Sequence, residues 1–142
     1  MTEYSLMIVD DDEVDRYSLK RLLRSCGINA EVHEASDGLA AIKYLEKRES
    51  DHPQSCLAFP PILVFVDINM PRMNGFEFLD AFSKLRDKNL VLETVVFLMI
   101  TSSENEDDKE QVAKYEFVKG YITKMPRDSS DLRNMIDAYL PA

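Results

Sequence analysis

Five short apolar runs alternate along the chain with segments of helical periodicity. The runs cover residues 6–9, 31–35, 62–66, 95–100 and 120–123. Short apolar runs of this kind are typical of buried strands, whereas apolar residues at every third or fourth position are typical of helices. Strands that alternate with helices predict a parallel sheet built from repeated strand–helix units.

The composition of each run predicts its place in the sheet. Residues 62–66 (Ile-Leu-Val-Phe-Val) and 95–100 (Val-Val-Phe-Leu-Met-Ile) are apolar at every position. Such runs are expected in central parallel strands, which helices cover on both faces. Residues 31–35 are more polar, and we expect this strand to lie nearer an edge.

Four segments between and after the strands show a helical apolar face. The expected buried faces consist of Val14, Leu19, Leu22, Leu23 and Cys26; Leu39, Ile42 and Leu45; Phe76, Leu79, Phe82 and Leu85; and Leu132, Met135, Ile136, Tyr139 and Leu140. Gly27 stands where a glycine commonly ends a helix.

A further helix is expected at residues 106–115, although this segment is polar apart from Val112, Ala113 and Tyr115. Ser103 and Glu106 have the spacing of a capping box. Few apolar anchors predict that this helix is the most mobile one. Residues 49–61 contain three prolines and no periodicity, so they are predicted to form a long surface loop.

Composition limits the possible classes of protein. A chain of 142 residues with 45% hydrophobic residues can bury a full core, and we expect one domain over residues 1–142 without an output domain. The net charge of -9 argues against direct binding to nucleic acid. Cys26 and Cys56 indicate neither a disulfide framework nor a zinc site, which fits the cytoplasm. We expect no export or membrane insertion.

Residues with chemical potential stand where the predicted strands end. In parallel α/β sheets, ligands bind beyond the carboxyl ends of the strands. Four of the strands are followed there by polar groups: Asp10, Asp11 and Asp12; Asp67; Thr101 and Ser102; and Lys124. We expect them to converge on one rim, with Asp67 in an exposed site.

These residue types suit phosphoryl chemistry. Clustered carboxylates repel each other unless a cation intervenes, so Asp10, Asp11 and Asp67 predict a Mg²⁺ site. An aspartate can attack phosphorus when cations neutralise the developing charge, and Lys124 supplies a cation. The hydroxyl of Thr101 can donate a hydrogen bond to a phosphoryl oxygen.

Each of these residues also has a simpler interpretation. Residues 10–12 can cap the helix that follows, Asp67 can open a turn, and Gly75 can relieve strain in a tight loop. Lys124 can be a solvated lysine and Thr101 an ordinary strand residue. Their joint occurrence, in order and at separate strand ends, favours a site. His33 and His52 are expected at the surface without a role.

Four segments together closely resemble the receiver domains of two-component response regulators. They are Ile-Val-Asp-Asp at 8–11, Asp-Ile-Asn-Met-Pro-Arg-Met-Asn-Gly at 67–75, Thr-Ser at 101–102 and Gly-Tyr-Ile-Thr-Lys at 120–124. The resemblance covers nearly the whole chain. It implies a flavodoxin-like (βα)5 fold, a three-layer α/β sandwich with a parallel sheet in the order 2-1-3-4-5.

The resemblance also implies roles for individual residues. Asp67 would be the phosphoacceptor, Asp10 and Asp11 the acidic pair, and Asn69 the residue whose main-chain carbonyl binds Mg²⁺. The remaining matches are the switch hydroxyl, the switch aromatic and the phosphate-binding lysine, at Thr101, Tyr121 and Lys124.

The implied function is a phosphoacceptor signalling switch. A histidine kinase or phosphotransfer protein would donate the phosphoryl group to Asp67. The resulting conformational change would regulate a protein partner through the face formed by the fourth helix, fifth strand and fifth helix. Beyond Mg²⁺-dependent self-phosphorylation and self-dephosphorylation, no enzymatic turnover is expected. Nucleic acid and membranes are not expected as partners.

Three other classes fit the sequence less well. A haloacid-dehalogenase-type phosphatase needs an acid/base aspartate at position 69, where this chain has asparagine. A degenerate receiver would have lost one of its key residues, and a flavin carrier would not place three aspartates near a phosphate. One departure from the receiver pattern is Met125, which separates Lys124 from Pro126, so the isomer of the Met125–Pro126 bond stays open.

Overall fold

The computed structural model describes residues 4–47, 59–101, 105–123 and 129–140, without the side chains of residues 101, 123 and 129–131. Strands and helices alternate along the chain. They are β1 (Ser5–Val9), α1 (Glu13–Ser25), β2 (Glu31–Ala35), α2 (Gly38–Glu46), β3 (Leu63–Val66), α3 (Gly75–Lys88), the 3₁₀ helix η2 (Leu90–Thr94), β4 (Val96–Thr101), α4 (Glu106–Val112), β5 (Val118–Thr123), α5 (Ser129–Ile136) and the 3₁₀ helix η3 (Asp137–Tyr139).

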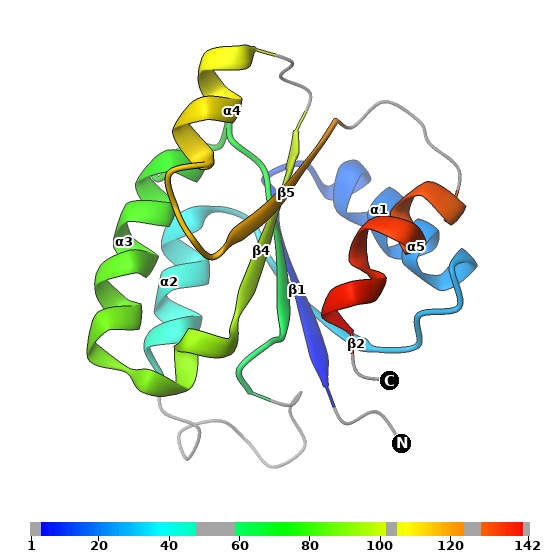
Figure 1. Cartoon of the computed structure of the whole chain (residues 1–142), viewed down its shortest axis with the longest axis horizontal. Coiled ribbons are helices and arrows are strands. Elements are labelled where there is room, and N and C mark those ends of the chain that lie inside the picture. The colour runs from blue at the N-terminus through cyan, green and yellow to red at the C-terminus, as the bar shows by residue number, and fades with distance from the viewer. Residues whose placement is uncertain (1–3, 48–58, 102–104, 124–128, 141–142) are drawn as a thin grey trace.

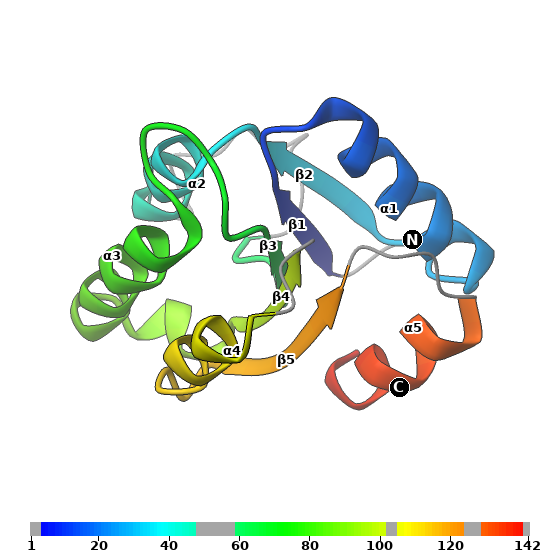
Figure 2. The same ribbon diagram turned by 90° about the horizontal axis from the view of Figure 1, so that it is seen from above.

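The strands form one parallel sheet in the order β2-β1-β3-β4-β5. Helices α2, α3 and α4 cover one face, and α1 and α5 cover the other (Figures 1 and 2). The flavodoxin-like three-layer fold is therefore confirmed. The central position of β3 and the edge position of β2 are confirmed as well.

Each face of the sheet has its own hydrophobic core. Alternate residues of a strand point to opposite faces, so Leu63 and Phe65 pack beneath α1 and α5, whereas Val64 and Val66 pack beneath α2 and α3. Phe97 of β4 lies in the core beneath α2 and α3, with its ring centroid 4.5 Å from that of Phe82. This burial explains why β3 and β4 are apolar at every position.

The predicted helical faces are largely correct, with two exceptions. Leu19, Leu23, Leu132 and Ile136 are buried, as expected. Val14, in contrast, is 70% exposed, because five positions separate it from Leu19 and a helix turns it away from the buried face.

Met135 is the second exception. Its side chain is 38% exposed, because it lies at the margin of the apolar stripe and borders Gly120 of β5. The helix also ends earlier than the pattern suggests. Tyr139 lies in η3 and Leu140 follows it, so these two residues extend the apolar face beyond α5.

Helix α4 is shorter than predicted and has a different N-cap. It ends at Val112, which is buried and anchors it, while Ala113 and Tyr115 follow the helix. The amide of Asp107 donates to the side chain of Asn105 at 2.8 Å, so Asn105 is the N-cap. The predicted capping box with Ser103 is therefore wrong, because the helix begins after Asn105; Ser103 itself lies outside the described residues.

Most of the loop predicted at 49–61 lies outside the described residues. Its end is described: the Phe59–Pro60 peptide bond is cis, and Pro61 is buried ahead of β3. Cys56 and His52 are not described either. His33 is half-buried rather than at the surface, and its ring stacks on Tyr44 at a centroid distance of 3.9 Å. Within the described ranges, no helix has the length and apolar character needed to cross a membrane.

Candidate functional site

Two neighbouring strands deliver the central carboxylates. β1 pairs with β3 in parallel register, with Val9 opposite Val66, so Asp10 and Asp67 are the first residues beyond adjacent strand ends. The amide of Asp67 donates to the carbonyl of Val9 at 3.0 Å, and the amide of Asp10 donates to that of Ala35 at 3.1 Å. The main chain of both aspartates is thus fixed by the sheet.

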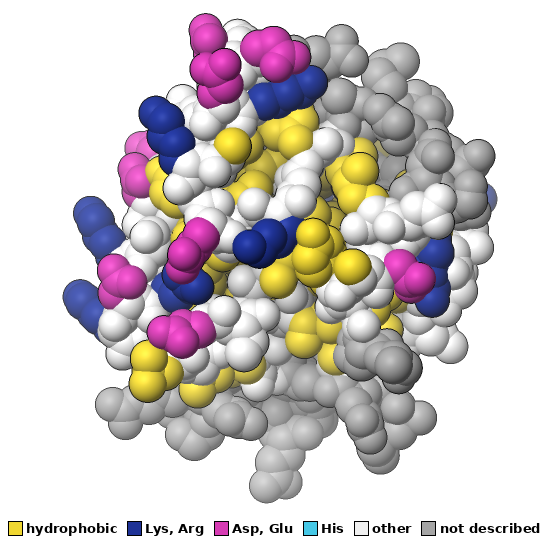
Figure 3. Space-filling view, in the orientation of Figure 1, with side chains coloured by type: hydrophobic (Ala, Val, Ile, Leu, Met, Phe, Trp, Pro, Cys, Tyr) yellow, Lys and Arg dark blue, Asp and Glu magenta, His cyan; other side chains and the backbone are white. Residues whose placement is uncertain are grey.

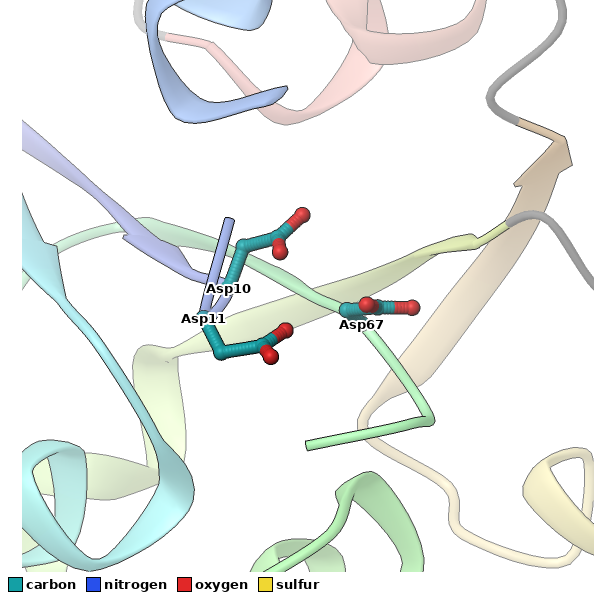
Figure 4. Close-up of side chains that lie close together, drawn as sticks. All are labelled: Asp10, Asp11 and Asp67. Atoms are coloured by element: carbon teal, nitrogen blue, oxygen red, sulfur yellow. The ribbon is translucent and has the colours of Figure 1, made fainter. Parts of the chain in front are cut away.

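The carboxylates of Asp10, Asp11 and Asp67 lie close together at this edge (Figure 4). One oxygen from each lies within 4.8 Å of the others. Asp11 is exposed, but Asp10 and Asp67 are only 3% and 5% exposed, which corrects the expectation that Asp67 occupies an exposed site. Neighbouring strands and the following loop enclose Asp67 because it directly follows the central strand.

This donor set fits a hard divalent cation. Buried carboxylates are costly unless they are paired, hydrogen-bonded or bound to metal. Three closely spaced carboxylates with one exposed member offer oxygen ligands and leave an open side for water, which is the coordination that Mg²⁺ prefers. The prediction that the carboxylates of Asp10, Asp11 and Asp67 lie close together is therefore confirmed.

Arg16 of α1 anchors the segment that carries Asp10 and Asp11. Its Nη1 donates to the carbonyl of Asp10 at 2.6 Å, and its Nε donates to Glu34 of β2 at 3.0 Å. Lys20 also donates to Glu34, at 2.8 Å, and this hydrogen bond is the main reason why the pKa of the Glu34 carboxyl is lowered. The acidic segment is thereby tied to the edge strand.

Asp12 acts as the helix cap among the three consecutive aspartates. Its side chain accepts from the amides of Val14 at 2.9 Å and Asp15 at 3.4 Å. Asp10 instead accepts from the amide of Asp12 at 2.9 Å, which orients its carboxylate at the strand end. The interpretation that helix capping explains the acidic run therefore applies to Asp12, not to Asp10 or Asp11.

Gly75 allows the start of α3 to approach Asp67. The amide of Gly75 donates to the carbonyl of Ile68 at 2.7 Å, and a Cβ at this position would lie 2.6 Å from the carbonyl oxygen of Asp67. Close approach, rather than relief of strain, therefore requires the glycine. The amide of Ile68 donates to Oδ1 of Asp67 at 2.8 Å and fixes the orientation of this carboxylate.

The other predicted site residues are placed only in part. Asn69 is exposed in the loop between Asp67 and α3. Tyr121 of β5 is half-buried, and Nζ of Lys109 lies 5.6 Å from its ring centroid. The backbone of Thr101 ends β4, but its side chain lies outside the described residues.

Several predictions fall entirely on residues that are not described. They concern Ser102, Lys124 and the Met125–Pro126 bond. Their positions relative to Asp67 remain predictions.

Two contacts near the site were not anticipated from the sequence. Arg16 binds the main chain of Asp10, and Arg72 pairs with Asp37. An Asp-Gly pair two residues after the second predicted strand, at Asp37 and Gly38, was the signal available for the second contact, because such pairs mark a turn or a helix cap. Nothing in the sequence pattern identified Arg16 as the partner of Asp10 or Arg72 as the partner of Asp37.

Comparisons with known proteins agree with this geometry. Residues 6–137 match the response regulator receiver domain family. Response regulator Rcp1 of Synechocystis is 30% identical over 92% of this chain and 82% of its own length. Chemotaxis protein CheY-3 of Vibrio cholerae is 34% identical over 93% of this chain and 88% of its own.

A solved structure supports the fold independently. The two-component response regulator from Cytophaga hutchinsonii superposes with a TM-score of 0.77 at 21% identity, over 98% of each chain. With its parallel sheet, its acidic cluster at the strand ends and a family match over most of its length, the chain belongs to the response regulator receiver domains, the phosphoryl-accepting switches of two-component signalling.

Proposed function

We propose that Asp67 is the phosphoacceptor and that a histidine kinase or a phosphotransfer protein is the donor. The observation that carries this proposal is the gathering of Asp10, Asp11 and Asp67 within 4.8 Å at the carboxyl edge of the sheet. Asp67 lies at the centre of the strand order, and the amide of Ile68 orients its carboxylate at 2.8 Å. An oriented carboxylate beside a cation site can act as a nucleophile.

The transfer exchanges one bond to phosphorus for another. A carboxylate oxygen of Asp67 attacks the phosphorus atom, and a P–O bond forms. The P–N bond to the donor histidine breaks, and the histidine nitrogen keeps the electron pair. The product is an aspartyl phosphate, and attack of water on phosphorus later returns the carboxylate and inorganic phosphate.

The chain's own residues would hold Mg²⁺ through Asp10, Asp11, Asp67 and the main-chain carbonyl of Asn69. When bound, Mg²⁺ supplies positive charge that offsets the charge of the carboxylates and the phosphoryl oxygens. Arg16 and the main-chain bonds to Val9 and Ala35 hold the acidic residues in place without the metal. Lys124 is proposed as the second cation, and Thr101 as the hydroxyl that binds a phosphoryl oxygen.

The proposed output surface is the face formed by α4, β5 and α5. Hydrophobic side chains gather over β5 between the two helices, and acidic side chains crowd the outer end of α4 (Figure 3). Tyr121 of β5 lies beside α4, with its ring centroid 5.6 Å from Nζ of Lys109, and Met135 of α5 borders Gly120 of β5. We propose that Thr101 and Tyr121 couple the phosphoryl group to a cytoplasmic protein partner at this face, and the net charge of -9 argues against nucleic acid as that partner.

The test is incubation with Mg²⁺ and acetyl phosphate, followed by intact-mass measurement. The wild-type chain should gain one phosphoryl group, and omission of Mg²⁺ should prevent the gain. The Asp67→Asn variant keeps the side-chain volume but lacks the nucleophile, so it should gain none. A full gain of mass in Asp67→Asn would overturn the assignment of Asp67.

A further inference from the structure

The loop between β3 and α3 contains an unusual backbone conformation. Arg72 has φ 66°, and among the described residues it is the one non-glycine residue with positive φ. The left-handed conformation is strained for a residue that carries a side chain, so it persists where surrounding contacts determine it. The contacts that the Arg72 side chain makes therefore indicate why the loop adopts this conformation.

Arg72 pairs with a buried carboxylate from another turn. Its Nε donates to Oδ2 of Asp37 at 2.8 Å, and its Nη2 donates to the same oxygen. The side chain of Asp37 is 4% exposed, and its Oδ1 also accepts from the amide of Ala40 at 2.9 Å, so this carboxylate both caps α2 and binds the arginine.

The pKa of Asp37 is consistent with an ion pair. Burial alone would raise the pKa of this carboxyl. The hydrogen bond from Ala40 and the guanidinium of Arg72 outweigh burial, and the pKa lies below its ordinary value. Asp37 is therefore charged at neutral pH.

The main chains of the two turns also touch. The amide of Gly38 donates to the carbonyl of Met73 at 3.3 Å. A Cβ on Gly38 would lie 2.8 Å from Cγ of Met73 and 2.9 Å from its carbonyl oxygen. The β3–α3 loop is thus seated on the start of α2 with no room for a larger residue at position 38.

Two clamps therefore enclose the segment that contains Asn69. At its base, the amide of Gly75 binds the carbonyl of Ile68 at 2.7 Å. Near its tip, the Arg72–Asp37 pair and the contact with Gly38 hold the loop against α2. Asn69 lies between the clamps and directly follows the residue that Asp67 contacts, Ile68.

We propose that Arg72 is a positioning residue for the Mg²⁺ site. Its ion pair with Asp37 fixes the β3–α3 loop before the metal arrives, so that the main-chain carbonyl of Asn69 is already held beside Asp67. The conformational entropy of the loop is then lost when the protein folds. Metal binding does not have to order the loop, so this entropy cost does not lower the affinity for Mg²⁺. This inference rests on the proposed function, because it assumes that Asn69 contributes a ligand.

The test compares Arg72→Gly with the wild type. Glycine adopts positive φ without strain, so this variant keeps the backbone conformation and removes only the side chain. Isothermal titration with Mg²⁺ should show an affinity about 10-fold lower, which is the effect expected when a group that orients a metal ligand is lost. In the metal-free protein, amide hydrogen exchange over residues 68–74 should become faster.

Two further variants test the mechanism. Asp37→Asn keeps an acceptor for the cap of α2 but removes the charge, and it should weaken Mg²⁺ binding in the same direction. The double variant should bind Mg²⁺ no more weakly than the weaker of the two single variants, because both changes break one pair and their effects are therefore not additive. Additive losses would show that the two residues act independently. Arg86→Ala is the matched control. Nη1 of Arg86 lies 2.6 Å from Oε1 of Glu116, and this ion pair does not involve the acidic cluster. The loss of Arg86 should therefore leave the Mg²⁺ affinity unchanged.

The outcomes separate this inference from the proposed function. If the wild type binds Mg²⁺, Asp11→Ala does not, and Arg72→Gly retains the wild-type affinity and exchange rates, then the role of Arg72 is overturned while the metal site stands. If the wild type has no measurable affinity for Mg²⁺, both proposals are overturned.

Discussion

Gly75 and Gly27 both stand at helix ends, but they are required for different physical reasons. Gly27 has φ +82° with open space around the missing Cβ, whereas Gly75 has main-chain atoms of Asp67 and Ile68 within 3 Å of that position. The first glycine satisfies a backbone conformation, and the second allows the loop that follows β3 to meet α3.

Gly75→Ala should therefore destabilise the protein more than Gly27→Ala. An added methyl group that collides with main chain costs about 2 kcal/mol or more, whereas a left-handed alanine costs about 1 kcal/mol. Urea unfolding of both variants measures the two free energies. Equal losses, or a larger loss for Gly27→Ala, would contradict the close approach at Asp67.

The Arg72–Asp37 pair predicts a specific dependence of stability on acid. The pKa of Asp37 lies below the ordinary value of 3.8, so as the pH falls the unfolded chain takes up this proton before the folded chain does. Its contribution to the free energy of unfolding is fully present above about pH 4 and is lost as the pH falls through the lower, folded-state pKa.

Near neutral pH, the unfolding free energy of Asp37→Asn should consequently be about 1–2 kcal/mol lower than that of the wild type. The difference should shrink below about pH 4, where the unfolded chain begins to take up the Asp37 proton while the folded chain still resists it. Urea unfolding of both proteins across this range provides the measurement. A difference that stays constant down to about pH 3 would show that the charge of Asp37 does not stabilise the fold.

At the scale of elements, polar contacts tie the turn after α4 to helix α3. The hydroxyl of Tyr115 donates to Asp80, and Arg86 binds Glu116 at 2.6 Å. Burial is the main cause that raises the pKa of Tyr115, and with the hydrogen bond to Asp80 it raises this pKa to about 12. The C-terminal end of α4 is thus anchored, so a shift of α4 on phosphorylation would pivot about that end.

Tyr115→Phe should reduce the unfolding free energy by about 1 kcal/mol, the usual value of one such hydrogen bond. The folded-state pKa exceeds the ordinary 10.0, so the contribution of the tyrosine is fully present below about pH 10 and is lost as the pH rises towards 12. Unfolding of both proteins at neutral pH and at about pH 11 should show the difference decreasing. Amide exchange at the end of α4 should also become faster in the variant, and unchanged exchange would argue against the anchor.

The strands could be predicted from sequence more fully than the helix ends. Runs such as 62–66 are apolar at every position because both faces are covered, and this pattern has no competing explanation of similar length. Helix limits depend on single polar side chains: Asn105 caps α4 because its side chain reaches the amide of Asp107, and Ser103 had an equally suitable residue type. The exposure of Val14 and Met135 depends on the angular position of each side chain around its helix axis relative to the sheet. The spacing of apolar residues along the sequence does not determine that position closely enough.

For the molecule as a whole, the acidic cluster links metal binding to stability. Three neighbouring carboxylates repel one another in the metal-free protein, in a chain whose net charge is already -9. Removal of one carboxylate therefore relieves repulsion and at the same time removes a ligand. These two effects have opposite signs when Mg²⁺ is present.

Asp11→Ala should raise the unfolding free energy of the metal-free protein by about 1 kcal/mol and abolish the stabilisation by Mg²⁺. Thermal unfolding with and without Mg²⁺ provides the measurement. The wild-type melting temperature should rise with Mg²⁺ concentration, whereas that of the variant should not. An equal Mg²⁺-dependent rise in both proteins would remove Asp11 from the set of ligands.

The parts of the site that follow from chain topology could be predicted, and the parts that join separate loops could not. Asp10 and Asp67 are adjacent because parallel strands place their carboxyl ends at one edge, which the strand pattern already implies. The pairing of Arg72 with Asp37 depends on how the loop after β3 folds back on the turn after β2. No periodicity in the sequence encodes that approach.

The parallel pairing of β1 with both β2 and β3 also has a consequence for the order of folding. Ser5 pairs with Glu31, but Leu6 must also pair with Leu63, far along the chain. Closing that long loop costs chain entropy before its contacts can repay it, so a sheet of this kind folds slowly compared with one built from local hairpins. During synthesis, the first strand must wait for the third, and the acidic cluster assembles only once β3 has paired with β1.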